Sequence, residues 1–142
     1  MSVSDPDCLF CKILAGELPS TRVDEDEHTI AFLDINPATR GHALVIPRNH
    51  SRDLLEIPQD DLTATFAAAQ RLARRLKERL APDGVNLINS CGAAAWQTVF
   101  HFHVHVIPRY ADDPARDGLK LPWVPAPGDP DEIKAVAAEL AA

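Results

Sequence analysis

The sequence has few cysteines, no long apolar run and no basic leader. Its three cysteines are an odd number, which argues against a disulfide framework of the kind that stabilises small secreted proteins. No apolar stretch approaches the roughly 18 residues of a membrane span, and residues 1–7 lack a basic region followed by an apolar one. These absences predict a cytoplasmic protein with reduced thiols and no membrane partner.

The chain also lacks an excess of positive charge. Its formal net charge of -7 gives no electrostatic footprint for nucleic acid or for an anionic membrane surface. A small anion can still bind, because local dipoles and hydrogen bonds outweigh distant, screened charge. The composition therefore favours a small-molecule partner and no nucleic acid.

The 142 residues suit one globular domain, residues 1–142, with an ordinary apolar and charged content. Periodicity and turn residues predict a short helix over 8–15, a hairpin of strands over 29–33 and 42–46, a long helix over 58–80, strands over 85–89 and 100–107, and a last helix over 131–141. The long helix is amphipathic, with a predicted apolar face of Leu62, Phe66, Ala69, Ala73, Leu76 and Leu80.

A tail begins at about residue 111, where the composition shifts to Asp, Pro and Gly. It is too short to bury a core of its own, so it is not a second domain. Trp123 within it is expected to anchor the tail to the core or to a partner subunit.

Three of the six histidines lie in five residues, as His101, His103 and His105. On a strand, successive side chains alternate between faces, so these three share one side while Phe102 and the two following valines face the core. An exposed strand edge would also show polar alternation. Histidine is an unusual choice for a merely solvated face, however, and this density favours a functional site.

Such a row can bind a transition metal, supply a nucleophilic imidazole or hold an oxyanion. The neighbouring residues favour phosphate chemistry. Gln97 and Thr98 can donate to phosphate oxygens, and the small polar loop over residues 89–95 contains a glycine that lets main-chain amides approach an anion.

Residues 97–107, Gln-Thr-Val-Phe-His-Phe-His-Val-His-Val-Ile, resemble the signature of the histidine triad (HIT) family. The resemblance extends over residues 8–19, 32–37 and 41–50, and covers about residues 8–110. It implies an α+β fold, with an antiparallel sheet, one long helix across it and short terminal helices, paired into a homodimer.

The resemblance also implies a covalent mechanism without a catalytic metal. The middle histidine, His103, would attack the α-phosphate of a nucleotide and form a nucleotidyl-histidine that water then hydrolyses. His105 would stabilise charge on the phosphate oxygens, and Gln97, Thr98 and the Val99 amide would complete the cradle.

The nucleoside half of the site follows from the same resemblance. Asp34 would accept from the ribose hydroxyls, or would only cap the turn before Asn36 and Pro37. The remaining matched positions are the apolar residues around a purine and two polar residues near the phosphate: Phe10, Ile13, Leu18, Phe32, Ile35, His42 and Asn89. Each apolar residue could equally be plain core packing.

A structural zinc site is expected from a second group of residues, two cysteines and two histidines. The C-x-x-C pair of Cys8 and Cys11 can present two sulfurs to one ion, and relatives that share this pair resemble the chain in adding equivalents of His50 and His101. The alternative is a buried pair of reduced cysteines. Cys91 lies in the phosphate loop and is expected to face solvent.

Two departures from the family concern the pocket rim. Trp96 stands where many relatives carry glycine, and the loop over residues 89–97 is one residue longer than in many. These departures leave the leaving group open.

The sequence thus predicts a histidine triad hydrolase resembling the purine nucleoside phosphoramidases, acting on a nucleotide conjugate. The alternatives are a dinucleoside polyphosphate hydrolase or phosphorylase, and a non-catalytic nucleotide-binding or interaction module. Binding alone does not require a nucleophile beside the phosphate, so the module is disfavoured.

Overall fold

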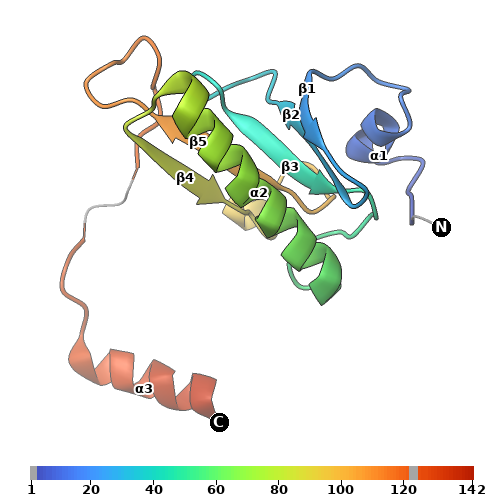
Figure 1. Ribbon diagram of the computed structural model, residues 1–142. Coiled ribbons are helices and arrows are strands. Elements are labelled where there is room, and N and C mark those ends of the chain that lie inside the picture. Colours follow the sequence, from blue (N-terminus) through green and yellow to red (C-terminus); the bar gives the residue numbers. More distant parts are fainter. Residues whose placement is uncertain (1–2, 122–124) are drawn as a thin grey trace.

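Five antiparallel strands form one sheet in the computed structural model, which describes residues 3–121 and 125–142. The sheet order is β1-β2-β3-β5-β4 (Figure 1). The elements are α1 (Leu9–Leu14), β1 (Arg22–Glu25), β2 (Thr29–Leu33), β3 (Ala43–Pro47), α2 (Gln59–Leu80), β4 (Gly84–Ile88), a short 3-10 helix (Ala93–Ala95), β5 (Val104–Arg109) and α3 (Pro130–Ala141). The α+β class with one long helix is confirmed.

The long helix α2 lies across one face of the sheet (Figure 1). Leu72 and Leu76 pack there against Phe102, Val104 and Val106 in one buried cluster. Each such large side chain contributes about 1.5–3 kcal/mol when fully buried. The alternation predicted around the histidines is therefore correct: the intervening apolar residues face α2, and the histidines face the other way.

The predicted apolar face of α2 is partly wrong. Its buried positions centre on Thr65, Ala68 and Leu72, whereas Phe66 is 40% exposed. Small residues let the helix lie close to the sheet, and Thr65 satisfies its buried hydroxyl by donating to the Asp61 carbonyl at 2.7 Å. Phe66 instead lines a groove between α2 and β4.

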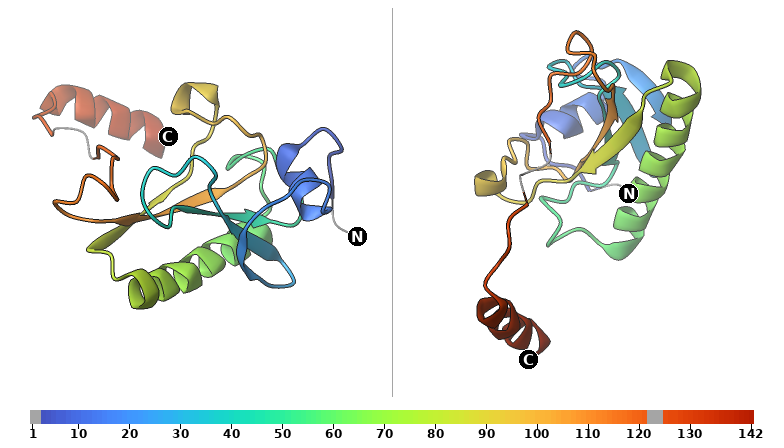
Figure 2. Two further views of the ribbon diagram at one scale, coloured as in Figure 1. Left: turned by 90° about the horizontal axis from the view of Figure 1, so that it is seen from above. Right: turned by 90° about the vertical axis from the view of Figure 1, so that its left-hand side faces the viewer.

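The opposite face of the sheet carries α1 and the loops that build the site (Figure 2). Phe10 and Ile13 of α1 pack against Ile30, Phe32 and Leu44 in a second buried cluster. The sheet therefore separates a structural layer, α2, from the layer that holds the candidate site.

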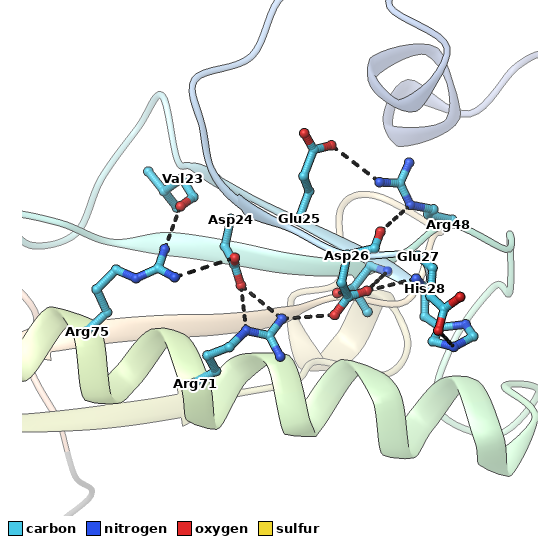
Figure 3. A network of polar contacts seen from close by, with 10 residues as sticks. Val23, Asp24, Glu25, Asp26, Glu27, His28, Arg48, Arg71 and Arg75 are labelled. Atoms are coloured by element: carbon cyan, nitrogen blue, oxygen red, sulfur yellow. Dashed lines mark hydrogen bonds and ion pairs between the residues drawn. The ribbon is translucent and has the colours of Figure 1, made fainter.

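Strand β1 was not predicted, because its sequence Arg-Val-Asp-Glu is mostly polar. It is an edge strand that ion pairs hold to α2 (Figure 3). Arg71 donates to Asp24 and Asp26, both at 2.9 Å, and Arg75 donates to the Val23 carbonyl at 2.8 Å. These arginines are partly exposed, so the pairs contribute modestly to stability.

The last strand differs from its predicted bounds of 100–107. Residues 101–103 lie outside the ladder, and Phe102 N–H donates instead to the Ser51 carbonyl at 2.7 Å. The strand also continues through Pro108, which pairs only with Val85 of β4. A proline fits there because β3 no longer flanks the strand at that position.

The first part of the tail is fixed to the body. Arg109 donates to Asp117 at 2.8 Å, and the Tyr110 hydroxyl donates to the Arg40 carbonyl at 2.8 Å. Further on, α3 lies apart from the sheet (Figures 1 and 2), with every residue exposed. Trp123 lies outside the described residues. Among the helices of the described part, none is both long and apolar enough to cross a membrane.

Candidate functional site

A cavity of about 540 Å³ opens on the face of the sheet that carries α1. Its floor includes His103 and His105. Its walls come from α1, β2, the turn between β2 and β3, and three residues that precede the histidines, Trp96, Thr98 and Val99. The lining residues are Leu9, Phe10, Ile13, Leu18, Pro19, Ser20, Phe32, Leu33, Asp34, Ile35, Asn36, Leu44, Trp96, Thr98, Val99, His103 and His105. Most of the predicted nucleotide-binding residues thus meet in one place.

His103 is held in one orientation by the main chain. Its Nδ1 lies 2.7 Å from the His101 carbonyl, which can only accept, so Nδ1 carries the proton of the neutral ring. The Nε2 lone pair is therefore left free. Burial lowers the pKa of His103, opposed by the His101 carbonyl bond and by Asp34, and this favours the neutral ring that a nucleophile needs.

His105 and His42 form a directed pair. Ala38 N–H donates to His42 Nδ1 at 3.0 Å, which puts the His42 proton on Nε2. That Nε2 lies 2.9 Å from His105 Nδ1, so His42 donates and the neutral His105 carries its proton on Nε2. Burial and the neighbouring His103 and His42 lower the pKa of His105 to about 4. His105 is thus a neutral N–H donor.

Asp34 has two contacts. Its Oδ1 accepts from Asn36 N–H at 2.8 Å, as a turn cap does, and its Oδ2 lies 3.6 Å from His42 Nε2. The carboxylate also lines the cavity. The turn cap and a contact with ligand are therefore compatible, because different oxygens serve them.

The apolar residues predicted to surround a purine all line the cavity. Phe10 meets Phe32 edge to face with ring centroids 5.5 Å apart, and meets His103 in the same way at 5.2 Å. Ile35 differs from these because it is 89% exposed, at the rim. Phe10, Ile13 and Phe32 also belong to the core cluster beneath, so their packing and lining roles coincide.

Gln97 and Asn89 do not line the cavity. The Gln97 amide accepts from Gly92 N–H at 2.8 Å and donates to the Arg52 and Val99 carbonyls. The Gln97 side-chain amide thus binds main-chain groups of its own loop and of Arg52. The predicted contact between Gln97 and a phosphate has no support from this geometry. Asn89 donates to the His103 carbonyl at 2.8 Å, so it lies close to the histidines as predicted.

The four predicted metal ligands converge in a second cluster beneath α1. His101 Nδ1 lies 3.5 Å from Cys8 Sγ and 3.6 Å from Cys11 Sγ. His50 Nδ1 lies 3.3 Å from His101 Nδ1 and 3.5 Å from Cys11 Sγ. Tetrahedral zinc, with bonds of about 2.0–2.3 Å, separates its donors by roughly 3.3–3.8 Å. The spacing fits.

The tautomer of His101 is also the one that can bind a cation. His101 Nε2 lies 2.9 Å from the Pro47 carbonyl, so it carries the proton and Nδ1 presents a lone pair toward the sulfurs. Burial is the main cause that raises the pKa of the Cys8 thiol, which favours the protonated form. A bound cation would displace the thiol proton. The cluster could hold a metal ion.

The contacts that sequence reasoning missed are main-chain ones. The carbonyls of Pro47, Ser51 and Arg52 orient His101, Phe102 and Gln97. Main-chain acceptors leave no mark on residue identity, so no sequence signal could have identified them.

Comparison with known proteins fits this geometry. The model of the HIT domain matches residues 15–112. The chain belongs to the HIT family. It is 38% identical over 138 residues to the adenosine 5'-monophosphoramidase HNT1 of Saccharomyces cerevisiae, covering 97% of this chain and 83% of that one.

Solved structures of HIT proteins share the fold. A Streptococcus mutans protein superposes with a TM-score of 0.89 and 43% identity, covering 99% of this chain and 87% of that chain. A zinc-bound histidine triad protein of Mycobacterium smegmatis superposes with a TM-score of 0.74 and 41% identity, covering 95% of this chain and 96% of that chain.

Proposed function

We propose that this HIT protein hydrolyses purine nucleoside phosphoramidates or related nucleotide conjugates at the α-phosphate, through a nucleotidyl-His103 intermediate. The observation that carries the proposal is the orientation of His103. Its Nδ1 is bound to the His101 carbonyl, and the ring lines the cavity beside the donor His105. The similarity to an adenosine 5'-monophosphoramidase supports this class of substrate.

The reaction runs in two displacements. The Nε2 lone pair of His103 attacks phosphorus, the bond from phosphorus to the leaving nitrogen breaks, and that nitrogen keeps the electron pair and takes a proton from solvent. Water then attacks the same phosphorus, gives up a proton, and the bond from phosphorus to Nε2 breaks. Nucleoside monophosphate leaves and the ring is neutral again. Two easier steps replace a difficult one.

Charge on the phosphate oxygens is met by hydrogen-bond donors. Within the described residues, no lysine or arginine lines the cavity. His105 Nε2–H, the Thr98 hydroxyl and the Val99 amide supply the donors, in a partly buried site where such dipoles are more effective than in water. We assign Gln97 to holding the loop that carries Thr98.

The nucleoside half binds a purine ribonucleoside. Phe10, Ile13, Leu18 and Phe32 offer an apolar slot, and Asp34 accepts from the ribose hydroxyls with the oxygen that does not cap the turn. Ile35 covers the base from the rim.

One comparison of substrates tests the function. Purified protein is given adenosine 5'-phosphoramidate, diadenosine polyphosphates and nucleotide sugars, and the kcat/KM values are compared. The proposal expects the phosphoramidate to have the largest value. A larger value for diadenosine polyphosphates would favour a dinucleoside polyphosphate hydrolase, and turnover of none would favour the binding module.

We propose that the Cys8, Cys11, His50 and His101 cluster holds a structural zinc. Two thiolates and two imidazoles fill a tetrahedral site and leave no position for substrate. The zinc-bound relative supports this identity. A reducing compartment such as the cytoplasm would keep both thiols available.

We also propose that the protein is a single domain that pairs as a homodimer. Among the described strands β4 is an outer one. Its residue Leu87 is 44% exposed, and Phe66 of α2, which lines the same groove, is 40% exposed. The isolated α3 exposes Ile133, Val136 and Leu140, and a helix of 12 residues is marginal without packing. A second copy can cover these surfaces. Light scattering should give twice the 15.5 kDa chain mass, and Phe66→Glu should give monomer.

A further inference from the structure

Trp96 has an unfavourable backbone conformation at the rim of the cavity. Its φ of 72° and ψ of 21° lie in the left-handed region, which is costly for a large side chain. Glycine would adopt this conformation without strain. Trp96 therefore occupies a position at which the backbone conformation favours glycine.

The loop around Trp96 enforces this conformation. Trp96 N–H donates to the Ala93 carbonyl at 3.0 Å, and Gln97 N–H donates to the Gly92 carbonyl at 3.1 Å. The buried Gln97 amide ties Gly92 N–H to the Arg52 carbonyl. A strained residue persists where surrounding bonds over-determine it, and such residues cluster at functional sites.

The indole itself is solvated. Trp96 is 85% exposed, and its indole ring has neither a hydrogen-bond partner nor an aromatic one within residues 3–121 and 125–142. An exposed tryptophan on a cavity that contains the candidate nucleophile is a surface for ligand.

The direction of the displacement places Trp96 on the side of the cavity that receives the leaving group. His103 is buried at the floor of the cavity, and in-line displacement puts the leaving group on the far side of phosphorus, toward the opening. The nucleoside half already has its walls in α1 and β2. Trp96 comes from the other wall, two residues before Thr98, where the 3-10 helix lies well apart from α1 (Figure 2).

We propose that Trp96 selects substrates whose leaving group carries a planar aromatic ring, by stacking on that ring. This inference rests on the proposed function and narrows its substrate class. The ring could belong to an aromatic amine or to a second nucleobase, because each offers the same flat π-face.

The kinetic test compares two adenosine 5'-phosphoramidates, one of tryptamine and one of n-butylamine. The ratio of their kcat/KM values should fall about tenfold in Trp96→Gly and should be largely kept in Trp96→Phe, since stacking on one ring is of that order. An unchanged ratio would overturn the proposal. Equal losses for both substrates with a lower melting temperature would show a role in the loop instead.

A binding test remains informative if neither amidate is hydrolysed, which would count against the proposed function alone. It uses the non-hydrolysable sulfamate that joins adenosine to tryptamine. Isothermal titration calorimetry measures its affinity, because the tryptamine indole would fluoresce together with the tryptophans of the protein. The sulfamate should bind about tenfold more weakly to Trp96→Gly, and equal affinities would overturn the proposal. A diadenosine polyphosphate competitor distinguishes the nucleobase source from the amine.

Discussion

The main-chain carbonyl of His101 lies 2.7 Å from Nδ1 of His103. His101 also faces Cys8 and Cys11 through its own Nδ1. A proposed metal ligand thus fixes the tautomer of the proposed nucleophile. Fold stability and chemistry are therefore joined through one peptide group.

His103→Ala should abolish the covalent intermediate while nucleotide binding is largely kept, because a nucleophile acts on the barrier more than on ground-state contacts. Mass spectrometry after quenching should show a nucleotidyl adduct on wild type. His28→Ala is the matched control, since the His28 side chain is 61% exposed and distant in sequence from the triad. An adduct at wild-type yield on His103→Ala would refute the assignment.

His42→Ala should lower kcat more than it raises KM. It removes the N–H that fixes His105 with its proton toward the cavity, and the loss should stay below the roughly 100-fold of a deleted oxyanion donor. Steady-state kinetics with adenosine 5'-phosphoramidate measure both constants. A rise confined to KM would place His42 in substrate binding only.

Asp34→Ala should weaken ribonucleotide binding by about 1–3 kcal/mol, the scale of a hydrogen bond to a charged group. The penalty should largely vanish with sugars that lack the hydroxyls. Asp34→Asn is the control, because its carbonyl can still cap Asn36 N–H. Calorimetry with both sugars decides, and equal penalties would assign Asp34 to the turn.

Acidification should destabilise the protein before its carboxylates titrate. Burial lowers the pKa of His105 from 6.5 to about 4. Between pH 6.5 and pH 4, His105 therefore binds a proton in the unfolded chain but stays neutral in the folded one. The free energy of unfolding is therefore unaffected by His105 above about pH 6.5 and decreases as the pH falls toward 4. The melting temperature of His105→Asn should depend less on pH across this window, while His28→Asn should follow wild type. Parallel curves for all three would contradict the prediction.

Zinc should be present at about one equivalent per chain. A chelator should lower the melting temperature, as should Cys8→Ser or Cys11→Ser, because binding to the native state adds stability. Cys91→Ser is the control, since Cys91 lies outside the cluster. Any loss of rate should be recovered on adding zinc back. Metal-free protein with unchanged melting of the cysteine variants would leave only a buried thiol pair.

Local pattern determined much of this protein from the sequence alone. The extents of α2 and α3, the hairpin of β2 and β3, and the opposite facing of Phe102 and the histidines all follow from periodicity and turn residues. The C-x-x-C spacing likewise brings the first two proposed metal ligands together, because the first turn of α1 places Cys8 Sγ 3.4 Å from Cys11 N–H.

Tertiary structure decided the rest. Strand β1 forms because arginines of α2 hold its acidic residues, and Phe66 is exposed because smaller residues of α2 meet the sheet. The free nitrogen of each site histidine depends on carbonyls and amides from other parts of the fold, such as Pro47 for His101 and Ala38 for His42. Residue identity specifies that a histidine can carry a proton on either nitrogen, but only a folded neighbour with a fixed donor or acceptor selects one.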